Sequence, residues 1–390
     1  MIVEFDPYSY EIHEDPYPTY RRLRDEAPAY YNEKRNFWAL SRYDDVRGAL
    51  NDWRTYTSTE GITIEPRRKG TEPHIIEMDP PRHTQLRALV SRAFTPNRIA
   101  RLEEPIRARA RMLIAPFASA GRVDLIADFA ALLPMAVISE MLGVPAAAQD
   151  ELRHAADALL HREPDSDELT AAGIEGATTL YGYFDELIRA RRSQPGDDLL
   201  SVLIDAEEQG HALTASELLG FCFLLIIAGN ETTTKLLGNA VSWLAENPDQ
   251  RTLVVGDASL LPGTVEETLR YDGSTQAMAR CLTRDVELHG EQMRAGTKVL
   301  LLLGSANRDE RHWGADADRF DIRRDTTGQL ALGHGIHHCL GAALARLEAR
   351  VALEELLPVL GDYTVEKERS RRVHSGNVRG FSSLPLRFTP

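Results

Sequence analysis

The stretch Ala331-Leu332-Gly333-His334-Gly335-Ile336-His337-His338-Cys339-Leu340-Gly341 decides how the rest of the chain is interpreted. Its two glycines before the cysteine and one after it predict a tight loop with exposed backbone N–H groups. The residues from Ala342 to Leu356 favour a helix that begins directly behind this loop. Backbone donors and the positive end of a helix dipole lower the pKa of a thiol and stabilise a metal-bound sulfur. The segment therefore predicts a thiolate at Cys339.

Two other interpretations of this segment remain open on spacing alone. In the first, the glycines only form a loop and Cys339 is a small buried apolar residue. In the second, the cysteine and its neighbouring histidines bind zinc. Adjacent His337 and His338 would point in different directions, and the sequence has no second cysteine and histidine cluster to complete a tetrahedral site, so zinc is disfavoured.

The segment resembles the haem-binding loop of the cytochrome P-450 family, Phe-Gly-x-Gly-x-His-x-Cys-x-Gly. Leu332 stands where the family pattern has phenylalanine, and it keeps that position apolar. The resemblance implies that Cys339 is the axial ligand of a haem b iron. It also implies a mainly α fold with small β-sheets and a long central helix over the haem. The pattern is matched by Gly333, Gly335, His337, Cys339 and Gly341.

A second motif lies on a long apolar segment expected to be helical, Ala215 to Glu246. An acid and three threonines interrupt its apolar run, which predicts a local distortion because hydroxyl side chains can divert backbone hydrogen bonds. A helix that merely emerges to solvent at Asn230 would explain the same pattern. The segment also resembles the family's Ala-Gly-x-Asp/Glu-Thr-Thr motif, matched by Ala228, Gly229, Glu231, Thr232 and Thr233.

The resemblance assigns roles to further residues. Glu267 and Arg270 match the family's Glu-x-x-Arg helix, and together with Arg319 they are expected to form a buried structural network that holds the cysteine loop. The haem carboxylates need cations or hydrogen-bond donors. The residues expected to bind them are His83, Arg87, Arg280 and His337.

The bulk composition is compatible with this fold. A chain of 390 residues with 43% hydrophobic residues can bury a large core, and it has no repeats or long linkers, so one domain over residues 1–390 is expected. Helices are predicted over Asn97–Phe117, Ala130–Leu142, Glu151–Leu160, Thr170–Arg191 and Ala215–Glu246. Strands are predicted over Phe37–Leu40, Val286–Leu288, Lys298–Leu302, Tyr363–Val365 and Leu384–Phe388.

Charge and cysteine usage narrow the cellular setting. A net charge of −14 argues against non-specific nucleic-acid binding. The three cysteines, Cys222, Cys281 and Cys339, have no disulfide-like spacing, which favours a reducing compartment. The apolar runs are short and the start resembles no signal peptide, so the protein is expected to be cytoplasmic, without membrane association.

The family's reaction inserts one atom of O2 into a small organic substrate and releases the other as water. The resemblance implies that Thr232 donates a hydrogen bond during oxygen activation and that Glu231 relays protons. A haem sensor without oxygenase chemistry, or a peroxide-driven enzyme, would not need this pair.

Electrons must come from a separate protein, because the chain has no room for a flavin domain; a ferredoxin with its reductase is expected. Five arginines are candidates for a surface patch on which the ferredoxin docks: Arg87, Arg92, Arg98, Arg346 and Arg350. It is an equal alternative that these arginines are scattered, solvated surface charges. Substrate contacts are expected from the loop Gly61–Thr71, the helices between Glu151 and Arg191, the helix before Ala228, the strand near Ala277 and the turn Gly380–Phe381.

Overall fold

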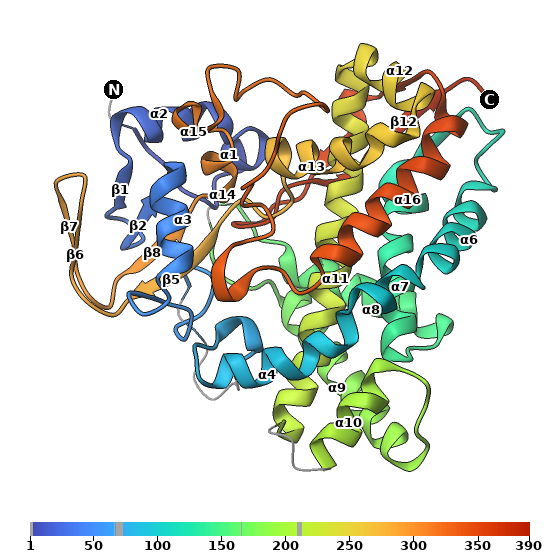
Figure 1. Ribbon diagram of the computed structural model, residues 1–390, viewed down its shortest axis with the longest axis horizontal. Helices are drawn as coiled ribbons and strands as arrows, with labels where there is room; N and C mark the ends of the chain where they lie inside the picture. The colour runs from blue at the N-terminus through green and yellow to red at the C-terminus, as the bar shows by residue number, and fades with distance from the viewer. Residues whose placement is uncertain (1–2, 66, 68–72, 165, 209–212) are drawn as a thin grey trace.

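The computed structural model describes residues 3–65, 67, 73–164, 166–208 and 213–390. Figure 1 shows a body of helices around α11 on one side and a smaller region with the main β-sheet on the other. The expected fold class, mainly α with small sheets and one long central helix, is confirmed. Of the expected loop from Gly61 to Thr71, residues 66 and 68–71 lie outside the described residues.

The helices have these bounds: α1 Tyr10–Glu14, α2 Tyr17–Glu26, α3 Tyr43–Asn51, α4 Arg82–Val90, α5 Pro96–Ala100, α6 Glu103–Ile114, α7 Leu132–Leu142, α8 Ala146–Leu160, α9 Ala171–Ser193, α10 Leu199–Glu208, α11 Ala215–Glu246, α12 Pro248–Gly256, α13 Leu261–Asp272, α14 Leu303–Ala306, α15 Glu310–Trp313 and α16 Ala342–Leu360. The strands have these bounds: β1 Ala29–Asn32, β2 Phe37–Leu40, β3 Tyr56–Thr57, β4 Arg122–Asp124, β5 Met278–Leu282, β6 Val286–Leu288, β7 Glu291–Met293, β8 Lys298–Leu301, β9 Tyr363–Val365, β10 Arg371–Arg372, β11 Phe381–Ser383 and β12 Pro385–Phe388.

Within the described residues the main sheet has five strands in the order β1-β2-β8-β5-β3. Strand β2 pairs with β8 in parallel, and the other pairs are antiparallel. Strand β5 thereby fixes Arg280 opposite Val299 in the middle of this sheet. The sheet is thus the scaffold that carries one of the expected cofactor-binding residues.

The long helix α11 begins and ends where the sequence predicts. At its start the Thr214 hydroxyl accepts a hydrogen bond from Glu217 N at 3.2 Å, and the Glu217 carboxylate accepts one from Thr214 N at 2.8 Å. At its end Pro248 opens the next helix. The helix is not interrupted at its threonines. Instead, the hydroxyls of Thr232 and Thr234 donate to the carbonyls of Ala228 and Asn230, both at 2.9 Å.

The predicted strands Phe37–Leu40, Val286–Leu288 and Tyr363–Val365 have the bounds of β2, β6 and β9, whereas other predicted elements differ from the structure at their ends. The predicted helix Asn97–Phe117 is divided into α5 and α6, and α8 begins five residues before the predicted Glu151. A π-helical turn over Ile126–Ala130 precedes α7. Such boundaries depend on packing and capping more than on periodicity.

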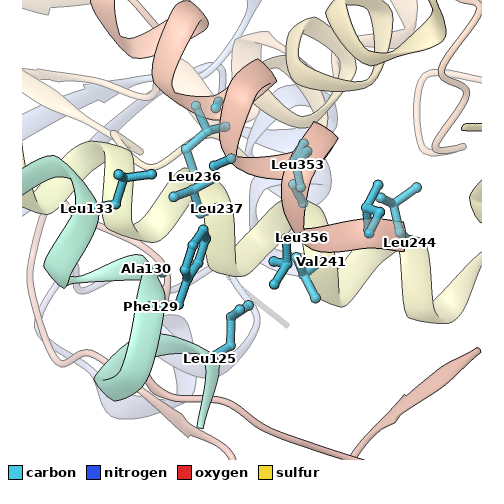
Figure 2. Close-up of a cluster of buried hydrophobic side chains, with 14 of the residues drawn as sticks. Leu125, Phe129, Ala130, Leu133, Leu236, Leu237, Val241, Leu244, Leu353 and Leu356 are labelled. Carbon is cyan, nitrogen blue, oxygen red and sulfur yellow. The ribbon is translucent and has the colours of Figure 1, made fainter. Parts of the chain in front are cut away.

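The core around α11 is built from leucines on its faces toward α7 and α16. Leu237, Val241 and Leu244 follow a helical spacing of four and three residues, and none is measurably exposed. They lie near residues of the π-helical turn, α7 and α16 (Figure 2). Each fully buried side chain of this size contributes about 1.5–3 kcal/mol to folding. The partners in this cluster include Leu125, Phe129, Leu133, Leu353 and Leu356.

By length and composition α11 could also cross a membrane, since it has 32 residues with a window of mean hydropathy 1.3. It packs against α7, α9, α13 and α16 instead.

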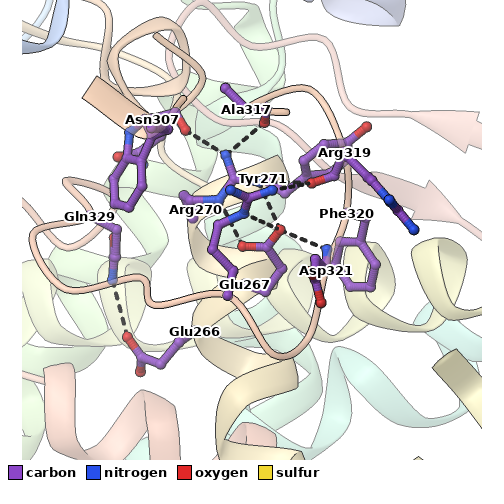
Figure 3. A network of polar contacts seen from close by, with 12 residues as sticks. Glu266, Glu267, Arg270, Tyr271, Asn307, Ala317, Arg319, Phe320, Asp321 and Gln329 are labelled. Carbon is purple, nitrogen blue, oxygen red and sulfur yellow. Dashed lines mark hydrogen bonds and ion pairs between the residues drawn. The ribbon is translucent and has the colours of Figure 1, made fainter. Parts of the chain in front are cut away.

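The Glu267–Arg270 pair is fully buried, as the sequence predicts (Figure 3). Arg270 Nε and Nη2 each donate to Glu267 at 2.7 Å, and Nη1 donates to the carbonyls of Asn307 and Ala317 at 2.8 Å. Asn307 Oδ1 in turn accepts a hydrogen bond from Leu330 N at 2.7 Å. The pair is thereby connected to the segment that leads into the cysteine loop.

The prediction that Arg319 supplies the third side chain is wrong. Arg319 is exposed and contributes only its carbonyl, 3.2 Å from Arg270 Nη2. The additional cation is Arg324, whose Nε lies 3.6 Å from Glu267 Oε1 and whose Nη2 lies 2.9 Å from Asp316. The segment turns between the two arginines, so sequence position alone does not indicate which one points inward.

Candidate functional site: a cysteine, a cation cluster and a threonine around one cavity

The cysteine loop has the tight backbone that its glycines predict. Gly333 and Gly335 have φ angles of 70° and 68°, in the left-handed region that favours glycine. A Cβ on Gly335 would also lie 2.7 Å from the carbonyl oxygen of Leu50. Cys339 N donates to Leu332 O at 2.8 Å, which closes the loop on itself. The loop is therefore a rigid support for the cysteine.

Cys339 faces a cavity of about 260 Å³ that lies between α11 and the cysteine loop. Burial raises the pKa of its thiol, while a hydrogen bond from the Gly341 backbone and the charges of Arg87 and Arg346 oppose this rise. These are the donors and cations that stabilise a thiolate when a metal is bound. Cys222 and Cys281 are buried and do not line the cavity, so Cys339 is the one thiol among the described residues that line it.

The four residues expected to bind carboxylates come together at one end of the cavity. Each of them lines it, although they come from α4, β5 and the cysteine loop. The rings of His83 and His337 are 4.4 Å apart, and His337 Nε2 is 3.1 Å from the Ser58 hydroxyl. Arg87 Nη2 donates to the carbonyl of His338 at 2.6 Å. The structure thus gathers His83, Arg87, Arg280 and His337 into one cation cluster.

This cation cluster has positive charge but no acidic ion-pair partner within the described part of the chain. Arg280 is 3% exposed, and burial lowers its pKa to about 10. Burial, together with the nearby arginines and His83, lowers the pKa of His337 to about 3, and burial also lowers the pKa of His83. At neutral pH both histidines are therefore neutral hydrogen-bonding groups, and the positive charge of the cluster comes from Arg87 and Arg280. Buried cations need anions, so the cluster fits a ligand that brings its own carboxylates into the cavity. Haem, with two carboxylates on an apolar ring, fits both the cluster and the cysteine.

The segment of α11 that faces the cysteine across the cavity carries the expected alcohol. Ala228, Gly229, Thr232 and Thr233 all line the cavity. The Thr232 carbonyl accepts a hydrogen bond from Ser274 at 2.6 Å, which fixes the helix here. Gly229 also has a packing reason to be glycine, because a Cβ there would lie 3.1 Å from Ile138 on α7.

Glu231, the expected acid partner of Thr232, does not line the cavity. Its carboxylate forms an ion pair with Lys235 Nζ at 3.1 Å, and both side chains are almost completely buried. Burial raises the pKa of Glu231, but Lys235 and a hydrogen bond with Asp157 outweigh it, and the net shift is downward. The structure therefore brings Thr232 to the cavity and turns Glu231 away from it.

Sequence reasoning missed two partners of this acid. Lys235 could have been found, because a spacing of four residues on a helix places it beside Glu231. Asp157 on α8 gave no local signal. Its side chain is 40% exposed and lies between Arg153 and Glu231. Burial and the hydrogen bond with Glu231 raise the pKa of Asp157 to about 8.

The cavity wall away from the cation cluster is apolar, with hydroxyl groups at a few positions. Of the segments expected to contact substrate, the helix before Ala228 and the strand near Ala277 line the cavity. Among the described residues, the loop from Gly61, the helices between Glu151 and Arg191 and the turn Gly380–Phe381 do not line it. The residues of this part of the wall include Ile75, Ile76, Phe221, Leu224, Leu225, Thr275 and Met278.

Comparison with known proteins agrees with this site. The family model described as Cytochrome P450 matches residues 255–377. Cytochrome P450 123 of Mycobacterium tuberculosis is 45% identical over 98% of this chain and 96% of its own length. Vitamin D(3) 25-hydroxylase of Pseudonocardia autotrophica is 39% identical over 99% of this chain and 97% of its own length.

Solved structures resemble the whole chain as well. CYP109Q5 of Chondromyces apiculatus has a TM-score of 0.89 at 39% identity, covering 100% of this chain and 99% of that one. CYP109E1 of Bacillus megaterium in complex with testosterone has a TM-score of 0.91 at 33% identity, covering 98% and 100%. The chain therefore belongs to the cytochrome P450 family and is a monooxygenase of that family.

Proposed function

We propose that this monooxygenase is a single-domain, cytoplasmic haem-thiolate enzyme that oxidises a small, mainly apolar organic substrate with O2 and two electrons from a ferredoxin. The observation that carries the proposal is the arrangement of one cavity. Cys339 lies on one side of it, the cation cluster of His83, Arg87, Arg280 and His337 at its end, and Thr232 on the opposite wall.

In this proposal the Cys339 thiolate would bind the iron of haem b, and the cation cluster would neutralise the haem carboxylates. The chemistry that this cofactor supplies when bound is the activation of O2, with one oxygen atom entering the substrate and the other leaving as water. Thr232 holds a proton at its Oγ1 for the reacting oxygen. To make it available, the hydroxyl exchanges its present hydrogen bond to Ala228 O for one into the cavity.

Glu231 acts in this proposal as a proton relay between solvent and the cavity. Its neighbour Asp157 reaches solvent and, with a pKa of about 8, carries a proton at neutral pH. Asp157 passes this proton to the Glu231 carboxylate, and Glu231 then rotates away from Lys235 toward Thr232. The ion pair with Lys235 sets the cost of this rotation.

The apolar wall supports a substrate held mainly by van der Waals contact. Among the described residues that line the cavity, those with titratable side chains belong to the cation cluster or to the cysteine loop. Glu348 is the exception. One similar structure contains testosterone and one relative is named as a vitamin D(3) 25-hydroxylase, which agrees with a mainly apolar substrate.

A ferredoxin that supplies the electrons would dock on a positively charged surface near the cysteine loop. The arginines considered for docking are partly neutralised within the chain. Arg346 pairs with Glu266 and Arg350 pairs with Glu103 at 2.7 Å, whereas Arg98 is exposed. The side chain of Arg92 lies outside the described residues.

The test uses the spectrum of the reduced carbon monoxide complex. The purified holoenzyme is expected to give the thiolate-type band, and Cys339→Ser is expected to abolish it. Cys281→Ser, which changes a buried cysteine in β5 away from the cavity, is the matched control and should retain the band. A thiolate-type band that persists in Cys339→Ser would show that the ligand assignment is wrong.

A further inference from the structure

The turn over residues 272–274 contacts both walls of the cavity. It begins with Asp272, the last residue of α13, and leads toward β5. Ser274 is 4% exposed and lines the cavity. Its hydroxyl donates to the carbonyl of Thr232 at 2.6 Å, so the turn is hydrogen-bonded to the α11 wall at the residue that carries the expected alcohol.

On the other side the turn packs against the segment that contains the cysteine. A Cβ on Gly273 would lie 2.9 Å from the Ala331 Cβ and 2.5 Å from the carbonyl oxygen of Leu269. The φ angle of Gly273 is −62°, which other residues adopt as well, so glycine is needed here for space. Ala331 opens the segment that ends in the cysteine loop, and it lines the same cavity. The turn is therefore in close contact with both walls.

The turn itself is held firmly by the fold. The Asp272 carboxylate is fully buried and accepts hydrogen bonds from Arg379 Nε at 2.8 Å and from Trp243 Nε1 at 2.9 Å. The backbone N–H of Arg379 also donates to the carbonyl of Ser274 at 2.7 Å. A turn with buried, satisfied polar groups at both ends is costly to displace, so it can serve as a fixed reference for the helix beside it.

Helix α11 is attached to this turn at a second point. Asn239 is fully buried, and its Nδ2 donates to the carbonyl of Asp272 at 2.8 Å. Thr232 and Asn239 are seven residues apart, which places them on the same face of the helix, two turns from each other. Two hydrogen bonds on one face resist both a shift of α11 along the cavity and a rotation about its axis.

The backbone of Thr232 needs such support, because its side chain has to move. The hydroxyl donates to Ala228 O at 2.9 Å, and in the proposed function it turns from there into the cavity. A carbonyl oxygen can accept two hydrogen bonds, so the bond from Ser274 does not displace the helical bond of the Thr232 carbonyl. The backbone can therefore stay fixed while the hydroxyl rotates. A misplacement of about 1 Å at a reacting centre can cost roughly 100-fold in rate.

We propose that Ser274 is a positioning residue for Thr232, whose backbone it holds at a fixed distance from the cysteine loop so that the Thr232 hydroxyl meets the reacting oxygen. This proposal rests on the proposed function, which gives Thr232 its role. Ser274 transfers no proton itself, because its hydroxyl hydrogen is engaged by the Thr232 carbonyl.

The first experiment measures hydrogen exchange of backbone amides in the holoenzyme by mass spectrometry. Ser274→Ala is expected to raise the exchange rate of residues 228–236 about 2- to 10-fold, because one local hydrogen bond is lost. Ser274→Cys, which keeps a similar shape but is a weak donor, should lie between this variant and the unmodified enzyme. Unchanged exchange in both variants would overturn the proposal.

Ser305→Ala is the matched control for this experiment. Ser305 is also buried, and its hydroxyl donates to the carbonyl of Ser41 at 2.8 Å, but it does not line the cavity. Its substitution should leave the exchange of residues 228–236 unchanged. Equally fast exchange of this segment in Ser305→Ala and Ser274→Ala would mean that loss of any buried hydroxyl loosens α11, which would overturn the specific role of Ser274.

The second experiment records the infrared C–O stretching band of the reduced carbon monoxide complex, which responds to groups on the wall opposite the cysteine. Ser274→Ala and Thr232→Ala are each expected to shift or broaden the band, and Ser305→Ala to leave it unchanged. The double variant of Ser274 and Thr232 should match Thr232→Ala alone, because residues that act through one group are not additive. If the two single changes add up in the double variant, Ser274 acts independently of Thr232 and the proposal is overturned.

The same spectra separate failure of this proposal from failure of the proposed function. A band that changes in Thr232→Ala but not in Ser274→Ala would overturn the positioning role alone. An unchanged band in Thr232→Ala would show that Thr232 does not face the bound cofactor, which overturns its role in the proposed function and the positioning role with it. The optical thiolate-type band should stay in all these variants, so failure of the ligand assignment at Cys339 is recognised separately.

Discussion

The carboxylate of Glu231 lies 3.1 Å from the ammonium group of Lys235, one helical turn further along α11, and both are buried beside the cavity that Thr232 lines. A Cβ on Gly380 would lie 2.4 Å from the Lys235 Cβ, so the backbone of residue 380 holds this lysine in place. The ion pair therefore keeps the acid ionised and out of the cavity until the lysine releases it.

Lys235→Met is expected to destabilise the protein by about 3–5 kcal/mol at neutral pH, because it leaves a buried carboxylate without its cation. The pKa of Glu231 is lowered in the folded state, so its stabilising effect is present above its ordinary pKa and is lost as pH falls. The deficit should thus be larger at pH 7.5 than at pH 4.5. Urea unfolding at both pH values measures it.

The double variant Glu231→Gln with Lys235→Met is the control for this prediction, because it removes both charges together. It should recover most of the lost stability. Equal deficits in the single and double variants would contradict the idea that the unpaired carboxylate causes the loss.

Thr232→Ala is expected to keep cofactor binding and electron consumption but to divert O2 to peroxide. Proton donation by a positioned hydroxyl contributes roughly 10²-fold or more, so product formed per electron should fall by at least about tenfold. Thr232→Ser, which keeps the hydroxyl, is the matched control and should be close to the unmodified enzyme. Peroxide and product are measured together, and unchanged coupling in Thr232→Ala would exclude this role.

Arg280→Met is expected to weaken retention of the cofactor, because Arg280 is a buried cation in the cluster that, in the proposed function, would bind the haem carboxylates. Loss of one charge-assisted hydrogen bond costs about 1.5–3 kcal/mol, or roughly 10- to 100-fold in affinity. The rate of haem transfer to an acceptor protein measures the effect. Arg284→Met, at an arginine 71% exposed just after the same strand, should leave the rate unchanged.

Arg324→Met is expected to cost about 1–3 kcal/mol of stability, because it removes the cation near Glu267 and Asp316. Arg319→Met should change stability by less than about 0.5 kcal/mol, because that side chain is exposed. Denaturant unfolding of the two variants compares them directly. If Arg319→Met lost more stability than Arg324→Met, the sequence-based assignment of Arg319 to the buried network would be supported.

Glu348→Leu is expected to gain stability relative to the unmodified protein as pH rises. Because the pKa of Glu348 is raised to about 8 in the folded state, the folded protein holds a proton that the unfolded chain releases above its ordinary pKa. The unmodified protein therefore loses stability between pH 5 and pH 8, by about 2–4 kcal/mol from this group. Parallel stability profiles of the two proteins over this interval would contradict the prediction.

The sequence by itself determined the features that depend on short spacing. Gly333 and Gly335, which precede Cys339, adopt positive φ angles that few other residues adopt, so the sequence alone indicates the tight loop. The capping residues Thr214 and Glu217 and the following Pro248 likewise determine the ends of α11. Family resemblance then indicated the cation cluster, although its members come from three separate parts of the chain.

Only the tertiary structure decided which way individual side chains point. The sequence motifs favour Arg319 as the third side chain of the buried network, whereas in the fold Arg324 lies beside Glu267. They favour Glu231 as the acid of the cavity, whereas in the fold Glu348 lies in the cavity wall. Burial, charge pairing and the resulting pKa shifts depend on residues far apart in the sequence, such as Asp157 on α8 beside Glu231 on α11. Local spacing determines which residue types are available, but the free energy of burying each polar group depends on the neighbours that the fold provides.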